Sequence, residues 1–196
     1  MFDHLEPNDS PIESLPILNA YLHTVAATLK PKVDRKAKAV VTIACLPSFE
    51  VEWMLALECS RSGHYTSYAC TADREIWPLE EAKTITPIKH ESPVSAELGF
   101  MLHEIYRLAL LGTRHSYSPN IGLDGVTYHF AYDHMSGKTW SPPENSLPGK
   151  LCALSNDLYN DTVAGRINER RVCRIIRWFR GNLPGLNDVR GGRTKR

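Results

Sequence analysis

Histidines and acidic residues are the side chains of this sequence that would support metal or acid–base chemistry if their spacing were right. His103-Glu104 begins as the zinc-protease pattern H-E-x-x-H does, in which two imidazoles one helical turn apart bind the metal. Arg107 stands where the second imidazole would be required, and its charge repels a cation. The sequence therefore predicts no metal here and a solvated or hydrogen-bonded His103.

The other histidines lack the H-x-H or H-x₃-H spacing of metal ligands. His129 and His134 flank one predicted strand, and we interpret them as one strand residue and one turn residue. A hydrolase-like enzyme would have to bring distant groups, such as His129, Asp124 and Cys59, within a hydrogen-bond reach of about 3 Å. We expect no cofactor, and such an enzyme is our third hypothesis for function.

Motifs that cradle phosphate or attack carbonyl groups are missing from the sequence. Neither G-x-x-x-x-G-K-[ST] nor G-x-G-x-x-G is present, and there is no G-x-S-x-G. The five cysteines are odd in number and include no C-x-x-C pair, which favours buried thiols in a reducing compartment. A disulfide between Cys59 and Cys70, across a predicted hairpin, is the alternative. The sequence thus favours a non-enzymatic protein.

Charge divides the chain into two parts. Residues 166–196 carry nine Arg and one Lys against Glu169 and Asp188, a net charge of +8. Residues 1–165 carry 13 basic and 20 acidic groups, a net charge of −7, so the overall charge of +1 hides a strong polarity. We predict an acidic α+β globular domain over 1–165 and a basic helix with a flexible tail over 166–196, both within one folded unit.

Arg170, Arg174 and Arg177, which we call the arginine row, recur at the spacing of one side of a helix, opposite Val172 and Ile176. Three interpretations of the row are open. It complements the acidic body internally, or it contacts nucleic-acid phosphates, or it binds an acidic protein or membrane headgroups. Arginine suits planar anions such as carboxylate and phosphate, and this preference does not choose between them.

Apolar periodicity predicts four helices and several short strands joined as hairpins. Because the strands follow one another rather than alternating with helices, we expect an α+β fold, with an antiparallel sheet and three to four helices packed mainly on one face. Aromatic residues of the strand over 126–132 share one side, which we interpret as core packing or a protein-contact surface rather than as an RNA-stacking platform. The predicted helices span 15–29, 95–111, 147–163 and 169–180; the predicted strands span 39–45, 51–59, 64–77, 126–132 and 138–140; residues 78–93 are predicted as loop and 135–137 as a turn.

The strand over 51–59 has the clearest alternation, with apolar residues at every second position. Glu52 and Glu58 fall between them, so we expect both carboxylates on the solvent side. The next strand, over 64–77, is polar and contains Tyr68. Together these residues would form a contact face.

The leading hypothesis for function is a non-enzymatic accessory protein of bacterial type, an inhibitor or immunity protein that engages a protein partner. Its contacts would come from Glu52, Glu58, Tyr68 and the arginine row, and an acidic body suits a basic partner. The alternative is a nucleic-acid-associated protein that uses residues 166–196. The longest apolar stretch, within 98–111, is short and interrupted by charge, and no secretory signal is recognisable, so we expect no membrane span and a cytoplasmic location.

Overall fold

An antiparallel sheet of six strands lies at the centre of the fold. The computed structural model describes residues 4–8, 16–34, 36–77, 84–115, 124–183 and 185–186. The strands are β1 (Ala39–Pro47), β2 (Trp53–Cys59), β3 (Tyr65–Ala72), β4 (Pro87–Val94), β5 (Val126–Tyr132) and β6 (Met135–Trp140). Their order in the sheet is β4-β3-β2-β1-β5-β6, so the first four form a meander and the β5–β6 hairpin joins the free side of β1.

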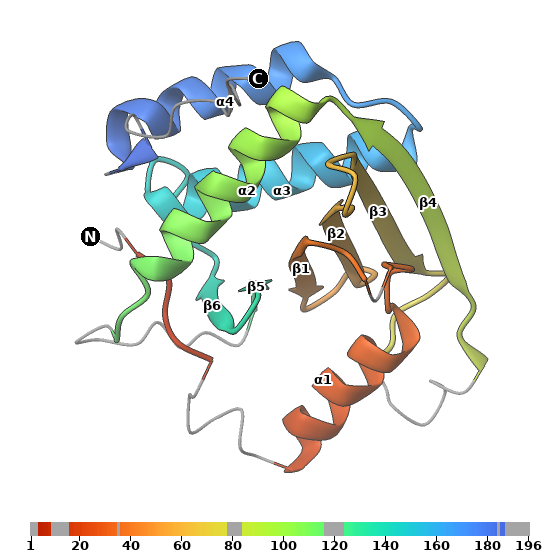
Figure 1. The fold of residues 1–196 in the computed structure, drawn as a ribbon. Helices are drawn as coiled ribbons and strands as arrows, with labels where there is room; N and C mark the ends of the chain where they lie inside the picture. The colour runs from red at the N-terminus through yellow and green to blue at the C-terminus, as the bar shows by residue number, and fades with distance from the viewer. Residues whose placement is uncertain are drawn as a thin grey trace.

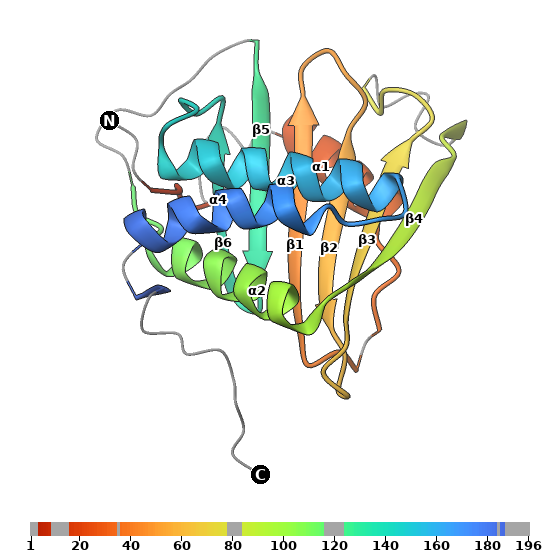
Figure 2. The ribbon, with the colours of Figure 1, turned by 90° about the horizontal axis from the view of Figure 1, so that it is seen from above.

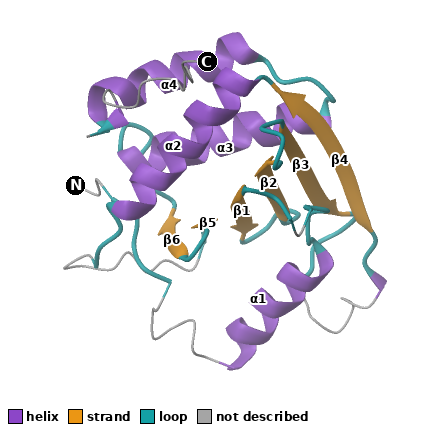
Figure 3. Ribbon diagram, viewed as in Figure 1, coloured by secondary structure: helices purple, strands orange, loops and turns teal. Residues whose placement is uncertain are grey.

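Four helices cover the sheet from both sides. They are α1 (Pro16–Thr28), α2 (Ala96–Leu111), α3 (Leu147–Val163) and α4 (Glu169–Asn182). Helices α2, α3 and α4 lie on one face and α1 lies on the other, with α4 as the outermost helix (Figures 1, 2 and 3). The predicted α+β fold, with an antiparallel sheet and most helices on one face, is confirmed. Within the described ranges, no helix has the length and apolarity needed to cross a membrane.

The alternation predicted for β2 is confirmed, and it feeds two separate apolar cores. Trp53 and Leu55 point towards α2, α3 and α4 and belong to the larger core. Met54 points to the opposite face, where it packs in a smaller core with Val25 of α1 and with Leu29, the residue after that helix. Every residue of β2 is therefore buried, because helices cover both of its faces.

Strand β4 corrects the prediction of loop over 78–93, of which residues 78–83 lie outside the described part. Pro87 and Pro93 favoured a loop, since proline cannot donate to a ladder. β4 is an edge strand, and at alternate positions the backbone nitrogen of an edge strand faces away from the sheet. A proline at such a position removes no hydrogen bond to the neighbouring strand, so β4 can contain two prolines.

The opposite edge, β6, is covered by the N-terminal segment. Glu6 and Lys138 exchange two backbone hydrogen bonds, of 2.8 and 2.7 Å. Leu5 is fully buried in the larger core and holds this segment in place. The edge of β6 is thus partly paired.

The largest differences from the predicted strand boundaries are at the end of β3 and at the start of β6. β3 ends at Ala72 rather than at Trp77, because Asp73 begins a bend. The second hairpin turns at Asp133 and His134 rather than over 135–137, and Asp133 has a φ of 54°, which an aspartate tolerates better than most residues.

The basic helix α4 is amphipathic and packs through its apolar side. Val172, Ile176 and Phe179 are buried in the larger core, and the Asn168 side chain caps the first turn by accepting a backbone N–H. The helical part of the basic segment is therefore integral to the core. The flexible tail was predicted from residue 181 on, whereas α4 continues to Asn182, and Leu183 and Leu186 are buried in the larger core. Residues 184 and 187–196 lie outside the described part.

Candidate partner-binding surface

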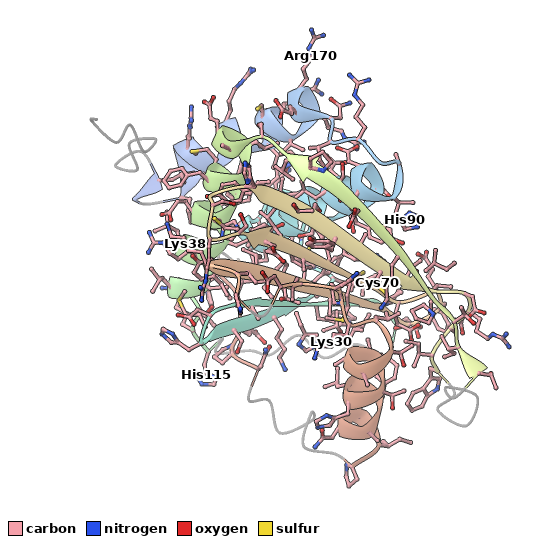
Figure 4. The ribbon with its side chains drawn as sticks, turned by 45° about the vertical axis from the view of Figure 1, so that its right-hand side comes forward. Lys30, Lys38, Cys70, His90, His115 and Arg170 are labelled. Carbon is pink, nitrogen blue, oxygen red and sulfur yellow. The ribbon has the colours of Figure 1, made fainter. Side chains whose placement is uncertain are left out.

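The arginine row occupies the outer side of α4. Arg170, Arg174 and Arg177 are all exposed, and Figure 4 shows Arg170 pointing away from the body of the protein. None of the three forms an ion pair or hydrogen bond with another residue in the described ranges. At a rise of 1.5 Å per residue, the row extends for about 10 Å along the helix.

Arg171, next to the row, behaves differently. Its guanidinium forms a close ion pair with Asp161, and its Nε lies 3.4 Å from Asp157 Oδ1. Asp161 is buried and also accepts the backbone N–H of Asn168 at 2.8 Å. Arg171 therefore pairs with acidic residues of the same chain, as one of the three interpretations expected of the arginine row. No ion pair among the described residues supports that interpretation for the row itself.

The neighbours of the row add charge and little bulk. Arg166, which the sequence reasoning had not singled out, is exposed in the bend before α4 and adds a positive charge near the start of the row. Cys173 is small and exposed between Arg170 and Arg174, and Glu169 is the acidic residue of the first turn. The outer side of α4 is thus a basic surface to which a partner can approach closely.

Glu52 does not lie on the solvent side, and that prediction was wrong. Only 1% of the residue is exposed. Its carboxylate accepts the Tyr21 hydroxyl at 2.7 Å and the Ile76 N–H at 2.9 Å. Burial and this contact raise the pKa of the Tyr21 phenol. Sequence periodicity found the correct face of β2 but could not show that α1 covers it.

Glu58 was predicted to be solvent-exposed and is also buried. It is 6% exposed, and its Oε2 accepts the backbone N–H of Asp34 at 2.7 Å. Tyr68 is half-buried on the neighbouring strand, where burial and the Glu58 charge raise the pKa of its phenol. Both carboxylates bind internal donors, so in this structure they are not available as partner contacts.

His103 is buried rather than solvated. Its ring lies between Tyr65 and Tyr132, with centroid distances of 5.3 and 5.6 Å, and its Nε2 has no hydrogen-bond partner in the described structure. Burial lowers the pKa of His103 to about 4, while the backbone of Leu57 and the charge of Glu104 oppose this shift. The helix periodicity had placed it only at the border of the apolar stripe.

The residues weighed for a hydrolase-like site do not come together. Cys59 pairs at the start of β1, where it faces Ala39, whereas Asp124 precedes β5 at the end where Val126 faces Pro47. Eight residues of strand separate these ends by about 26 Å. His129 lies on the α1 side of the sheet and Cys59 on the other. Among the described residues, no group of three or more His, Cys, Asp or Glu could hold a metal ion.

The thiols follow the sequence prediction in part. All five cysteines are free, so the alternative Cys59–Cys70 disulfide is not formed. Cys70 belongs to the smaller core on the α1 side, which is the opposite face from Cys59. Four of the five are buried as predicted, and Cys173 is exposed.

His103 and His129 make the free energy of unfolding dependent on pH. The pKa of each is lowered to about 4, mainly by burial, and the Lys138 charge contributes to the shift of His129. Between pH 6.5 and pH 4 the unfolded chain binds protons that the folded chain does not, so stability is lost as pH falls through this window. We expect the loss to reach about 1.4 kcal/mol per pH unit for each histidine.

Urea unfolding at pH 7, 6 and 5 measures this slope. A His103→Gln variant should lose about half of it, because one of the two titrating groups is gone. His134→Gln is the matched control, since that side chain is 84% exposed and should leave the slope unchanged. An unaltered slope in His103→Gln would contradict the assignment.

Comparison of the chain with protein-family models, with curated proteins and with solved structures found no match. A function for this protein is therefore proposed from the geometry of the molecule.

Proposed function

We propose that this protein is a non-enzymatic binding protein that contacts the phosphate backbone of nucleic acid through the arginine row of α4. The observation that carries the proposal is that three exposed arginines stand on one side of the outermost helix without an ion pair to the described part of the chain. Unpaired guanidinium groups bind phosphate oxygens in bidentate geometry.

Phosphate is favoured over an acidic protein surface by what surrounds the row. A stable protein interface is usually centred on buried aromatic or aliphatic anchors. The exposed residues of α4 include no large apolar side chain: they are Glu169, Arg170, Cys173, Arg174, Arg177, Arg180, Gly181 and Asn182. Phosphate contacts need charge and no such anchor.

The row fits contact with the backbone better than reading of bases. α4 is the outermost helix of its layer (Figure 1), so its exposed side is open to a phosphate backbone. Asn182 is the exposed amide on α4, and its Nδ2–H already donates to the Trp178 carbonyl at 2.7 Å, so the bidentate pairing with adenine that an amide can form is not favoured there. We therefore propose sequence-independent binding.

Fluorescence anisotropy with a labelled duplex and a labelled single strand, both of mixed sequence, tests the proposal. Arg170→Glu, Arg174→Glu and Arg177→Glu together should weaken binding at least tenfold at about 100 mM salt. The slope of log K against log salt should be about −0.9 for each phosphate contact, and the triple variant should lose about three such contacts. Replacement of the same residues by Lys should cost only a few-fold, because charge is kept.

The matched control moves the same amount of charge elsewhere. Lys30, Lys32 and Lys89 are exposed outside α4, and their joint replacement by Glu should have a much smaller effect than reversal of the row. An equal loss of DNA affinity in this control would mean that the effect comes from the net charge of the protein and not from the arginine row. Absence of binding at 50 mM salt, or tighter binding of poly-glutamate than of DNA, would overturn the nucleic-acid proposal, the second result in favour of an acidic protein partner.

Point substitution is preferable to removal of the basic segment. Deletion of residues 166–196 would also remove Val172, Ile176 and Phe179 from the core, so loss of binding would report loss of folding.

A further inference from the structure

Large apolar side chains are exposed on α1, on the β1–β2 loop and on the segment that follows β3. Ile17 is 56% exposed, Phe49 73% and Trp77 45%. Tyr21 follows Ile17 by one helical turn, and its ring meets that of Trp77 edge to face at 5.4 Å. We call Ile17, Tyr21, Phe49 and Trp77 the apolar patch.

The patch is held in place by the buried carboxylate of Glu52. This carboxylate accepts both the Tyr21 hydroxyl and the backbone N–H of Ile76, the residue before Trp77. The β1–β2 loop reaches the same region, because Val51 at its end packs with Tyr21 against the smaller core, and Phe49 lies two residues before Val51. A buried polar group thus fixes three separate segments whose exposed side chains are apolar.

Helix α1 has the composition of a covered helix although it lies at the surface. Residues 16–28 include no Asp, Glu, Lys or Arg, and Val25 is the one buried residue of the helix. A surface helix of a soluble domain normally carries charge on its outer side. Exposed apolar area without charge is typical of an interaction site.

The surroundings of the patch are acidic. Glu50 and Glu75 are exposed on the two loops, and Arg74 is partly neutralised by Asp73 at 3.6 Å. The Glu75 charge contributes to the raised pKa of Tyr21, after burial and Glu52, which places it near that ring. The apolar centre and acidic rim together define the chemistry of an occupant.

We propose that the apolar patch docks a basic protein segment that supplies an apolar anchor, as one side of a cationic amphipathic helix does. This proposal is independent of the nucleic-acid surface, because α1 and α4 lie on opposite faces of the sheet (Figure 2). A second copy of the chain fits poorly as the occupant. Its basic helix, α4, has its apolar side buried in its own core and offers only arginines to the patch.

A synthetic amphipathic helix of Leu and Lys, about 14 residues long, is the probe, and a Leu and Glu peptide of the same pattern is its counterpart. Titration by isothermal calorimetry at about 50 mM salt should show binding of the Lys peptide and at least tenfold weaker binding of the Glu peptide. Ile17→Ser, Phe49→Ser and Trp77→Ser together should weaken the Lys peptide at least tenfold. Glu50→Gln with Glu75→Gln should weaken it about threefold.

The matched control removes apolar side chains of similar exposure elsewhere. Ile88 is 44% exposed and Leu111 60%, and their joint replacement by Ser should change the affinity less than twofold. If the triple variant unfolds, Ile17→Ser with Phe49→Ser carries the same expectation, since neither makes the ring contact with Tyr21.

Several outcomes would overturn the proposal. These are no binding of the Lys peptide at about 1 mM, equal binding of the Glu peptide, and an equal loss in the control variant. Sedimentation that shows self-association abolished by the triple variant would assign the patch to a second copy instead. None of these results bears on DNA binding by the arginine row, so the two proposals fail separately.

Discussion

Replacement of Arg171 by alanine is expected to lower the free energy of unfolding by about 2 kcal/mol, although the neighbouring arginines tolerate the same change. The substitution leaves the buried Asp161 carboxylate with the Asn168 N–H as its remaining hydrogen-bond donor in the described structure. A buried charge that has lost its counterion is costly. The cost is moderated because the Arg171 side chain is 40% exposed and water can partly replace it.

Arg174→Ala is the matched control on the same helix. It should change stability by less than about 0.5 kcal/mol, because this side chain makes no ion pair with the described residues. It should instead weaken DNA binding, whereas Arg171→Ala should leave the affinity of the folded protein nearly unchanged. Urea unfolding and anisotropy on both variants measure this opposite ranking. Equal destabilisation by the two would show that α4 is not docked as described.

Gly149→Ala is expected to be more damaging, with a loss of at least about 3 kcal/mol or failure to fold. A Cβ at this position would lie 2.0 Å from the Pro143 carbonyl oxygen, which is backbone and cannot move aside cheaply. The clash also falls on the cap of α3, where Ser146 Oγ donates to Pro143 O and accepts the Gly149 N–H. Thermal unfolding should show the loss directly.

Gly181→Ala is the corresponding control in α4. A Cβ there meets nothing within 4 Å, so the variant should be as stable as the wild type or more stable by up to about 1 kcal/mol, through higher helix propensity. A Gly149→Ala protein with wild-type stability would mean that the start of α3 is not built on this close approach.

The fold was largely predictable because apolar residues recur at helical or strand spacing in most of its elements. Helix α3 begins and ends where the sequence predicted, and the side chains of β2 alternate as expected. The exceptions follow from tertiary context. β4 was missed because Pro87 and Pro93 argue against a strand unless its place at the edge is known. The position of α1 on the opposite face was not predictable, since a single apolar stripe does not say which surface it will cover.

The candidate surface was predictable only where charge and helix period coincide. Arg170, Arg174 and Arg177 share one exposed side of α4, as their spacing indicated. For Glu52 and Glu58 the prediction gave the correct face of the strand but wrongly expected solvent there. That face is buried by α1 and by the chain around Asp34, which the strand's own sequence does not indicate. The exposure of Trp77 gave no local signal, since tryptophan is normally taken for core.

The two proposed surfaces allow simultaneous binding. The arginine row lies on α4 and the apolar patch includes two residues of α1, and these helices lie on opposite faces of the sheet (Figure 1), so a partner at one surface need not block the other. A protein held at α1 could thereby be brought to nucleic acid held at α4. The inhibitor hypothesis and the nucleic-acid hypothesis are then compatible properties of one molecule.

The construction of the sheet margins restricts how any partner can be recognised. Pro87 and Pro93 remove two outward-facing backbone donors from β4, and Glu6 already occupies part of β6. Both margins are therefore poor templates for an added strand, whether from a peptide, another copy of the chain or a growing fibre. Recognition through either proposed surface would then depend on side-chain chemistry, which a few substitutions can change without disturbing the backbone framework.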